Sequence, residues 1–181
     1  MELAFFDRII YRMSMESWRS KIERWKFNFY PAYFGTGAKV TYVADDWSEV
    51  RLKIPLNWQT HNYVGTIFGG SLYGAIDPIF MLMLIKILGP EYLIWDKSAK
   101  IDFKRPGRTT LYATFRLSGE EIESIKQELE MQRSLNRFYT VDLVDHRGRV
   151  HTSFEKTLYI RKKKSLTANS GPACFERSRS G

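Results

Sequence analysis

Apolar residues near the N-terminus follow the spacing of helices. They recur three and four positions apart in two runs: Phe5, Phe6, Ile9, Ile10 and Met13, then Trp18, Ile22, Trp25 and Phe29. Ser14 is placed to cap the second run, and Pro31 is placed to stop it. The pattern predicts one or two N-terminal helices that lie against an apolar surface.

Alternating apolar and polar positions predict strands in the rest of the chain. A turn at Asp45–Asp46 joins two such segments, and four more follow Gly89–Pro90. The six segments are 38–44, 48–56, 92–103, 109–117, 138–144 and 150–160. Residues 120–133 carry apolar side chains at helical intervals and predict a short amphipathic helix. Because the strands come in runs rather than alternating with helices, we expect an antiparallel sheet and an α+β fold.

Residues 69–88 form an apolar run long enough for a helix of about five turns. The run has almost no polar face, so we expect it to be buried on all sides, with the sheet curled around it. Pro78 lacks an amide hydrogen and lies four residues after Gly74, which predicts a kink beside Asp77.

Composition limits the class of protein. The chain has 181 residues, 44% of them hydrophobic and 27% charged, which fits one globular domain and excludes general disorder. One cysteine excludes an internal disulfide and a cysteine-rich zinc module, and the three histidines show no metal-ligand spacing. The acidic start lacks the features of a signal peptide, and Asp77 and Pro78 argue against a membrane span, so we expect a soluble protein with no stable membrane insertion.

The net charge of +8 is concentrated at the C-terminus. Residues 161–181 hold six basic side chains against the single acid Glu176. We interpret residues 162–181 as a solvated, disordered tail, which leaves little surplus charge for nucleic acid on the fold itself. Anchoring of this tail to an anionic membrane is the alternative.

Two features of the 69–88 segment carry chemistry. Asp77 lies among apolar neighbours, so it is either a buried carboxylate held by hydrogen bonds or a general base with a raised pKa. Gly69–Gly70 opens the helix, where free amide hydrogens can bind an oxyanion or a polarised carbonyl. Asp77 follows Gly70 by about two turns, so both can border one groove, an arrangement suited to acyl transfer. The dinucleotide fingerprint, the phosphate-binding loop and a nucleophile elbow at Ser71 all lack required residues.

The stretch 62–77, NYVGTIFGGSLYGAID, resembles the signature of hotdog-fold acyl-CoA thioesterases of the phenylacetic-acid-pathway type. That family has Asn, His-Gly-Gly and Asp at the positions of Asn62, Phe68-Gly69-Gly70 and Asp77. The segment IDFKRPG at 101–107 resembles a strand end of the same fold, and the chain is most similar to an uncharacterised bacterial subfamily. The resemblance covers residues 31–161, between an N-terminal helical segment at 1–30 and the tail.

The resemblance implies a long central helix wrapped by a curved antiparallel sheet, in a cytoplasmic homodimer whose active sites lie between subunits. Gly70 of one chain would polarise the thioester carbonyl, Asp77 of the other would activate water or attack directly, and Asn62 would orient water or the carbonyl. The remaining predicted substrate contacts are Phe68, Gly69, Asp96, Ser98 and the three cations Lys104, Arg105 and Arg108. The cations would meet coenzyme A phosphates, unless they are ordinary surface charges. No cofactor is implied beyond the coenzyme A of the substrate.

This sequence departs from the family where Phe68 replaces the histidine. Asp96, with Ser98 expected on the same face, occupies the place where relatives carry Ser or Thr, so Asp77 and Asp96 would raise each other's pKa. Three hypotheses follow: a thioester hydrolase, a non-catalytic acyl-ligand binding protein, and an interaction protein that uses its basic tail. The sequence leaves open the acyl chain, coenzyme A against a carrier protein, dimer against tetramer, and whether the N-terminal segment caps the acyl tunnel or pads the sheet.

Overall fold

A computed structural model describes residues 16–163 of the chain. The helical run expected at residues 5–13 and most of the expected tail lie outside these residues. The elements are α1 (Trp18–Phe29), α2 (Pro31–Phe34), β1 (Lys39–Val43), β2 (Glu49–Ile54), α3 (Gly69–Ile76), α4 (Ile79–Leu88), β3 (Tyr92–Phe103), β4 (Leu111–Arg116), α5 (Gly119–Met131), β5 (Leu135–Val144) and β6 (Val150–Lys162). Their order is the one predicted, with a short α2 added.

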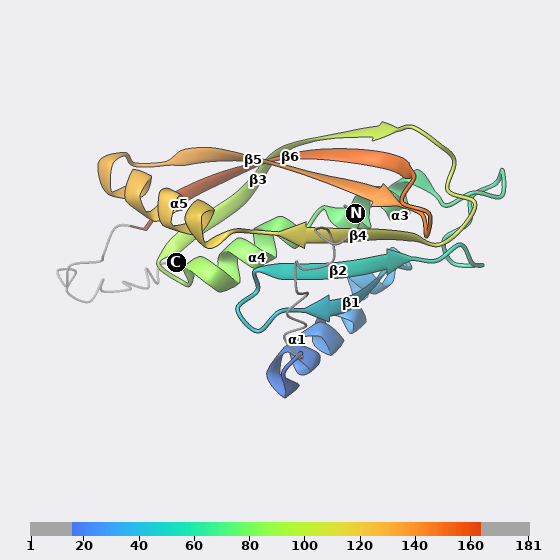
Figure 1. The fold of residues 1–181 in the computed structure, drawn as a ribbon, viewed down its shortest axis with the longest axis horizontal. Coiled ribbons are helices and arrows are strands. Elements are labelled where there is room, and N and C mark those ends of the chain that lie inside the picture. The colour runs from blue at the N-terminus through green and yellow to red at the C-terminus, as the bar shows by residue number, and fades with distance from the viewer. Residues whose placement is uncertain (1–15, 164–181) are drawn as a thin grey trace, which may run out of the picture.

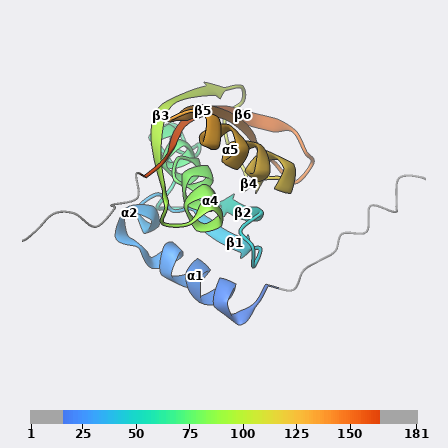
Figure 2. The ribbon, with the colours of Figure 1, turned by 90° about the vertical axis from the view of Figure 1, so that its left-hand side faces the viewer.

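The strands form one six-stranded antiparallel sheet in the order β1-β2-β4-β5-β6-β3. The sheet curves around α3 and α4, which run through its concave side (Figures 1 and 2). This is the hotdog fold, so the predicted α+β architecture is confirmed. The two edge strands are β1, which α1 covers, and β3.

Strand alternation places the core between sheet and helix. Val50, Leu52 and Ile54 on β2 are each no more than 2% exposed, while the residues between them are half-exposed. They share one cluster with Met83 and Leu84 of α4, both fully buried. Burying these side chains removes enough apolar surface from water to hold helix and sheet together, at about 25 cal/mol for each Å².

The backbone hydrogen-bond ladder of the central helix is broken at Asp77 and Pro78. Asp77 ends α3 with its amide donating to the Tyr73 carbonyl, and α4 restarts when the Leu82 amide donates to the Pro78 carbonyl. Pro78 has no amide hydrogen to continue the ladder, which explains the break. Both residues keep right-handed helical backbone angles, so α3 and α4 form one long helix, Gly69–Leu88, with an irregular turn at the predicted position.

The expectation that the 69–88 segment is buried on all sides was wrong. Gly69–Leu88 has the length and hydropathy of a membrane span, yet half of that stretch is buried inside the fold. Tyr73 and Ile85 are each 40% exposed on one side of the helices, which the sheet does not cover. Asp77 and Lys86 are the two charged residues of this stretch, and both are partly exposed.

The N-terminal helix also differs from expectation. Ser17, not Ser14, caps α1 by accepting from the Ser20 amide, and Pro31 begins α2 rather than only ending α1. The apolar stripe of α1 faces away from the sheet: Trp18 is 76% exposed and Phe29 is 62% exposed. The expected apolar contact surface for this stripe is therefore absent from the described part of the chain.

Candidate functional site

The break in the central helix brings Asp77 beside a buried lysine. Lys156 on β6 is 2% exposed, and its Nζ lies 2.5 Å from Asp77 Oδ1 and 2.9 Å from Asp96 Oδ1. The two carboxylates are 33% and 30% exposed, so the ammonium forms the floor of the cluster and the carboxylates form its mouth. One cation between two carboxylates leaves a net negative charge at the surface.

Lys156 is the residue that the sequence analysis missed. It lies on β6 at a position that faces the core, between the buried Phe154 and Leu158. A lysine at an inward position of an alternating strand is costly unless an acid meets it. Lys156 is a charged residue at an apolar position of β6, and Asp77 is a charged residue in an apolar helix. Taken together, these two exceptions to the sequence pattern could have predicted the pair.

Burial and neighbouring charges shift the pKa values of two residues at the cluster, Asp96 and Tyr73. Burial raises the pKa of the Asp96 carboxyl, the Asp77 charge adds to the rise, and the Lys156 ammonium opposes it. Burial, followed by the nearby Asp77 carboxylate, raises the pKa of the Tyr73 hydroxyl. The expected mutual influence of the two carboxylates is therefore present at Asp96.

Ser98 does not lie on the same face as Asp96, so that prediction was wrong. Asp96 pairs with Leu158 and Ser98 pairs with Thr157, so Lys97 is an extra residue in β3. Leu158 is fully buried and Thr157 is half-exposed, because they point to opposite faces of β6. The bulge at Lys97 turns Ser98 away from the carboxylates.

Two aromatic rings flank the start of α3. A side chain carbon on Gly70 would lie 2.3 Å from the Phe68 ring, and one on Gly69 would lie 3.1 Å from the Phe103 ring. Both rings are more than half exposed. A side chain at either position would have to displace one of these rings, so the two glycines let Phe68 and Phe103 lie close to the backbone at the start of α3.

A separate cleft of 330 Å³ opens beside the same helix start. Asn62, Gly69, Phe103, Lys104 and Arg105 line it, whereas Gly70, Asp77 and Arg108 do not. The Asn62 side chain is held by its own loop: its Nδ2 donates to Thr66 Oγ1 at 2.9 Å, and its Oδ1 accepts from the Val64 and Thr66 amides. The role of Asn62 toward water or substrate stays a prediction.

The basic segment at the cleft is held from behind by the β5–β6 hairpin. The amides of Lys104 and Arg105 both donate to the His151 carbonyl, and Arg105 Nη1 donates to the Val150 carbonyl at 2.6 Å. The His151 ring contacts the Pro106 carbonyl at 3.1 Å and the buried Asp145 carboxylate at 3.3 Å. These contacts fix the backbone of the segment and leave the Lys104 side chain in solvent.

Predicted site residues thus fall into two groups in one copy of the chain. The cleft gathers Asn62, Gly69, Lys104 and Arg105, and the acidic cluster gathers Asp77 and Asp96. In residues 16–163, no group of three or more His, Cys, Asp or Glu side chains has the arrangement of a metal site. The chemistry that the two groups offer is a carboxylate at the surface and amide donors beside a basic cleft.

The fold of the chain is the hotdog fold. Residues 19–160 match the family described as a domain of unknown function, DUF4442, and the chain belongs to that family. No curated protein is similar to the chain.

Solved structures share the fold at low sequence identity. A Pseudomonas aeruginosa protein of unknown function, described as a probable thioesterase, has a TM-score of 0.70 at 18% identity, over 79% of this chain and 95% of that chain. A Chlorobaculum tepidum protein of unknown function has a TM-score of 0.64 at 16% identity, over 80% and 95%. A Haemophilus influenzae thioesterase has a TM-score of 0.57 at 12% identity, over 78% and 90%.

Proposed function

We propose that the chain is a cytoplasmic acyl thioesterase that works as a homodimer, with Asp77 as its base. The observation that carries the proposal is the Asp77 carboxylate at the helix break, one-third exposed, with Oδ1 bound by the buried Lys156. The ammonium holds and orients the carboxylate at the surface, and in our proposal the carboxylate takes a proton from water. The activated water then attacks the thioester carbonyl, and the thiol leaves.

The edge strand β3 supports the proposed homodimer. Among the described residues 16–163, this 12-residue strand pairs only with β6, and six consecutive residues at its centre, 95–100, are exposed. An unprotected edge of this length is a template for another strand, and pairing two copies along β3 would continue the sheet. It would also bring the open side of α3 and α4 toward the same helices of the partner, so that Gly70 amides of one chain face Asp77 of the other.

The substrate end of the proposal rests on the cleft. Lys104 and Arg105 offer two cations to a polyanion, and the cleft reaches the Gly69 amide at the helix start. A coenzyme A thioester, or the phosphopantetheine arm of a carrier protein, has this combination of phosphate and carbonyl. We therefore propose an acyl thioester of one of these two kinds as substrate.

The alternative function is acyl binding without turnover. Phe68 stands where related thioesterases carry histidine, and its ring packs against Gly70. An apolar ring at this place favours binding of an acyl chain but supplies no hydrogen bond to the carbonyl.

The release of free coenzyme A from a panel of acyl thioesters distinguishes the two functions. We expect turnover by the native chain and a loss of at least about 100-fold in kcat for Asp77→Asn, the range of general-base effects. Asp102→Asn, on the exposed part of β3, is the matched control and should keep native rates. Equal rates for Asp77→Asn and Asp102→Asn would reject Asp77 as the base, and binding without release of thiol in the native chain would select the alternative.

A further inference from the structure

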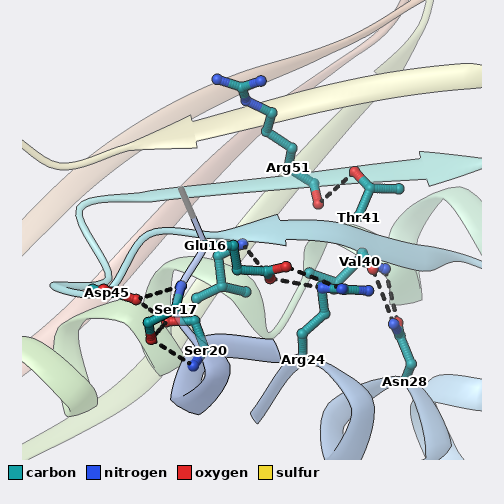
Figure 3. A network of polar contacts seen from close by, with 10 residues as sticks. Glu16, Ser17, Ser20, Arg24, Asn28, Val40, Thr41, Asp45 and Arg51 are labelled. Carbon is teal, nitrogen blue, oxygen red and sulfur yellow. Dashed lines mark hydrogen bonds and ion pairs between the residues drawn. The ribbon is translucent and has the colours of Figure 1, made fainter. Parts of the chain in front are cut away.

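The helix α1 lies on the sheet with its polar side inward. Asn28 makes a pair of hydrogen bonds with the Val40 backbone, at 2.9 Å through Nδ2 and 2.8 Å through Oδ1. Ser20, the only buried residue of α1, donates to Asp45 Oδ1 at 2.6 Å. Figure 3 shows these contacts together, between α1 and the β1 side of the sheet. These hydrogen bonds, together with Phe27, which packs against the core with its ring centroid 4.2 Å from that of Tyr33, hold the helix in this orientation.

An ion pair fixes the same orientation. Arg24 donates to both oxygens of Glu16, at 2.7 Å through Nε and 3.0 Å through Nη2, and Glu16 is 10% exposed (Figure 3). Glu16 also accepts from the Val43 amide of β1. A helix held by buried polar groups on one face cannot turn its apolar face to the core without leaving those groups unpaired.

The outward face of α1 is an unbroken apolar stripe. We call the four side chains Trp18, Ile22, Trp25 and Phe29 the aromatic stripe; they are 76%, 40%, 58% and 62% exposed. Their spacing of four, three and four residues puts them on one line along the helix. Tyr30 and Phe34, at 63% and 54% exposure, extend the apolar surface past the end of α1. Exposed patches of this kind mark interaction sites.

Cations border the aromatic stripe on both flanks. At about 100° for each residue, Arg19 and Lys26 lie on one side of the stripe and Lys21 lies on the other. All three are exposed. The one acid of α1, Glu23, is half-buried and is shared between Lys86 of α4 at 2.7 Å and Lys26 at 3.5 Å. This leaves Arg19 and Lys21 without an acid of α1 beside them. The border of the stripe therefore carries net positive charge.

We infer that the aromatic stripe of α1 docks the protein on an anionic lipid surface. Tryptophan and phenylalanine on one face, with lysine and arginine beside them, are the features of helices that lie in the membrane interface. The basic side chains can reach the headgroups while the rings enter the acyl boundary. The groove of 250 Å³ between Trp25, Phe29 and Phe34, with Lys39 at its wall, gives an acyl chain or headgroup a further place to bind.

The positive charge beside the stripe favours an anionic lipid surface over a second copy of the chain as its binding partner. In a two-fold interface the same surface meets itself, so Arg19, Lys21 and Lys26 of two copies would come together around the stripe. Like charges at such an interface cost several kcal/mol in general, and no exposed acid of α1 is available to offset them. An anionic surface has the opposite sign and suits the net charge of +8 of the whole chain.

Co-sedimentation of the full chain with vesicles tests the inference. The probe is phosphatidylcholine vesicles, with or without about 30 mol% phosphatidylserine, at low and high salt. We expect binding to the anionic vesicles that weakens at high salt, because salt screens the attraction. Trp25→Ser/Phe29→Ser should lower the partition coefficient at least about ten-fold. The control Trp58→Ser/Tyr63→Ser removes two exposed rings outside the stripe and should bind as the native chain does.

A second variant, Arg19→Gln/Lys21→Gln, tests the contribution of the basic side chains to vesicle binding. At about five-fold for each basic side chain, loss of both should weaken binding to anionic vesicles about 25-fold. Arg133→Gln/Arg147→Gln, two exposed cations outside the stripe and outside β3, is the matched control and should have no such effect. A full chain that ignores anionic vesicles overturns the inference. Native-like vesicle binding by Trp25→Ser/Phe29→Ser would also overturn it and would assign the membrane contact to the basic tail. If this variant changed the oligomeric mass but not vesicle binding, the stripe would instead be a contact with another copy of the chain.

Discussion

At the scale of single residues, the chemistry depends on one buried cation. Lys156 satisfies two carboxylates at once and is itself almost fully removed from water. Removing the ammonium or the carboxylates leaves the remaining charge partly buried and without a partner. The resulting loss in the free energy of unfolding is larger than the gain that the ion pair gives over an apolar pair. The cluster therefore couples stability to the state of the proposed base.

Lys156→Met should destabilise the fold and shift its dependence on pH. Because the partner carboxylates are about one-third exposed, we expect a loss of about 1–3 kcal/mol in the free energy of unfolding at pH 7. The pKa of Asp96, already raised by burial, should rise further once the ammonium is gone. A group with a raised pKa stabilises the fold most below its unfolded pKa, so the loss should shrink as the pH falls below about 4.

Urea unfolding of the native and variant chains at several pH values measures this. Lys126→Met, on the surface of α5 where the lysine pairs with the exposed Glu123, is the control and should stay close to native stability. An equal loss at every pH for Lys156→Met would contradict a role for the ammonium in balancing the carboxylates.

At the scale of elements, the sequence predicted what alternation determines and missed what single contacts determine. The hairpin at β1 and β2, the α5 insert and all twelve residues of β3 follow from apolar spacing. The bulge at Lys97 leaves no mark in that spacing, so the side of Ser98 was predicted wrongly. The face of α1 was also predicted wrongly, because the two hydrogen bonds between Asn28 and the Val40 backbone join residues twelve positions apart and have no signature in either segment.

The β5–β6 hairpin positions the cleft through its turn. Asp145 is buried and accepts from Arg149 Nε at 2.8 Å and from the amides of Arg147 and Arg149. Burial alone would raise the pKa of the Asp145 carboxyl, but hydrogen bonds from Arg149, Arg147 and His151 outweigh it and hold that pKa well below its ordinary value. The turn therefore depends on an ionised carboxylate.

Asp145→Asn should lower stability near neutral pH. The native pKa is depressed, so the contribution of Asp145 is present above the unfolded pKa near 3.9 and is lost as the pH falls through the folded pKa. We expect a lower urea midpoint for the variant at pH 7 and a difference that narrows below about pH 4. Asp142→Asn, exposed on the same hairpin, is the control. A difference that does not narrow in acid would contradict this role for the charge.

At the scale of the whole molecule, the two proposed surfaces lie at opposite ends of the strand order. β3 is one edge of the sheet and β1, covered by α1, is the other. Pairing of two copies along β3 would therefore leave both aromatic stripes free for lipid. We expect a particle of twice the 21.3 kDa chain mass in solution by light scattering.

The central claim is that Asp77 of one chain acts on a carbonyl held by Gly70 of the other. Gly70→Pro removes an amide donor that has no partner within the first helical turn, although its ring displaces the Phe68 ring, and Asp77→Asn removes the base, so each variant alone should release little thiol from acyl-CoA. Co-expressed together, the two chains form hybrid dimers with one site that has both groups intact. The measurement is thioesterase activity of the purified mixture: we predict recovery to about a quarter of the native rate, since half of the dimers carry one working site of two. A mixture as inactive as its parents would contradict a site shared between chains.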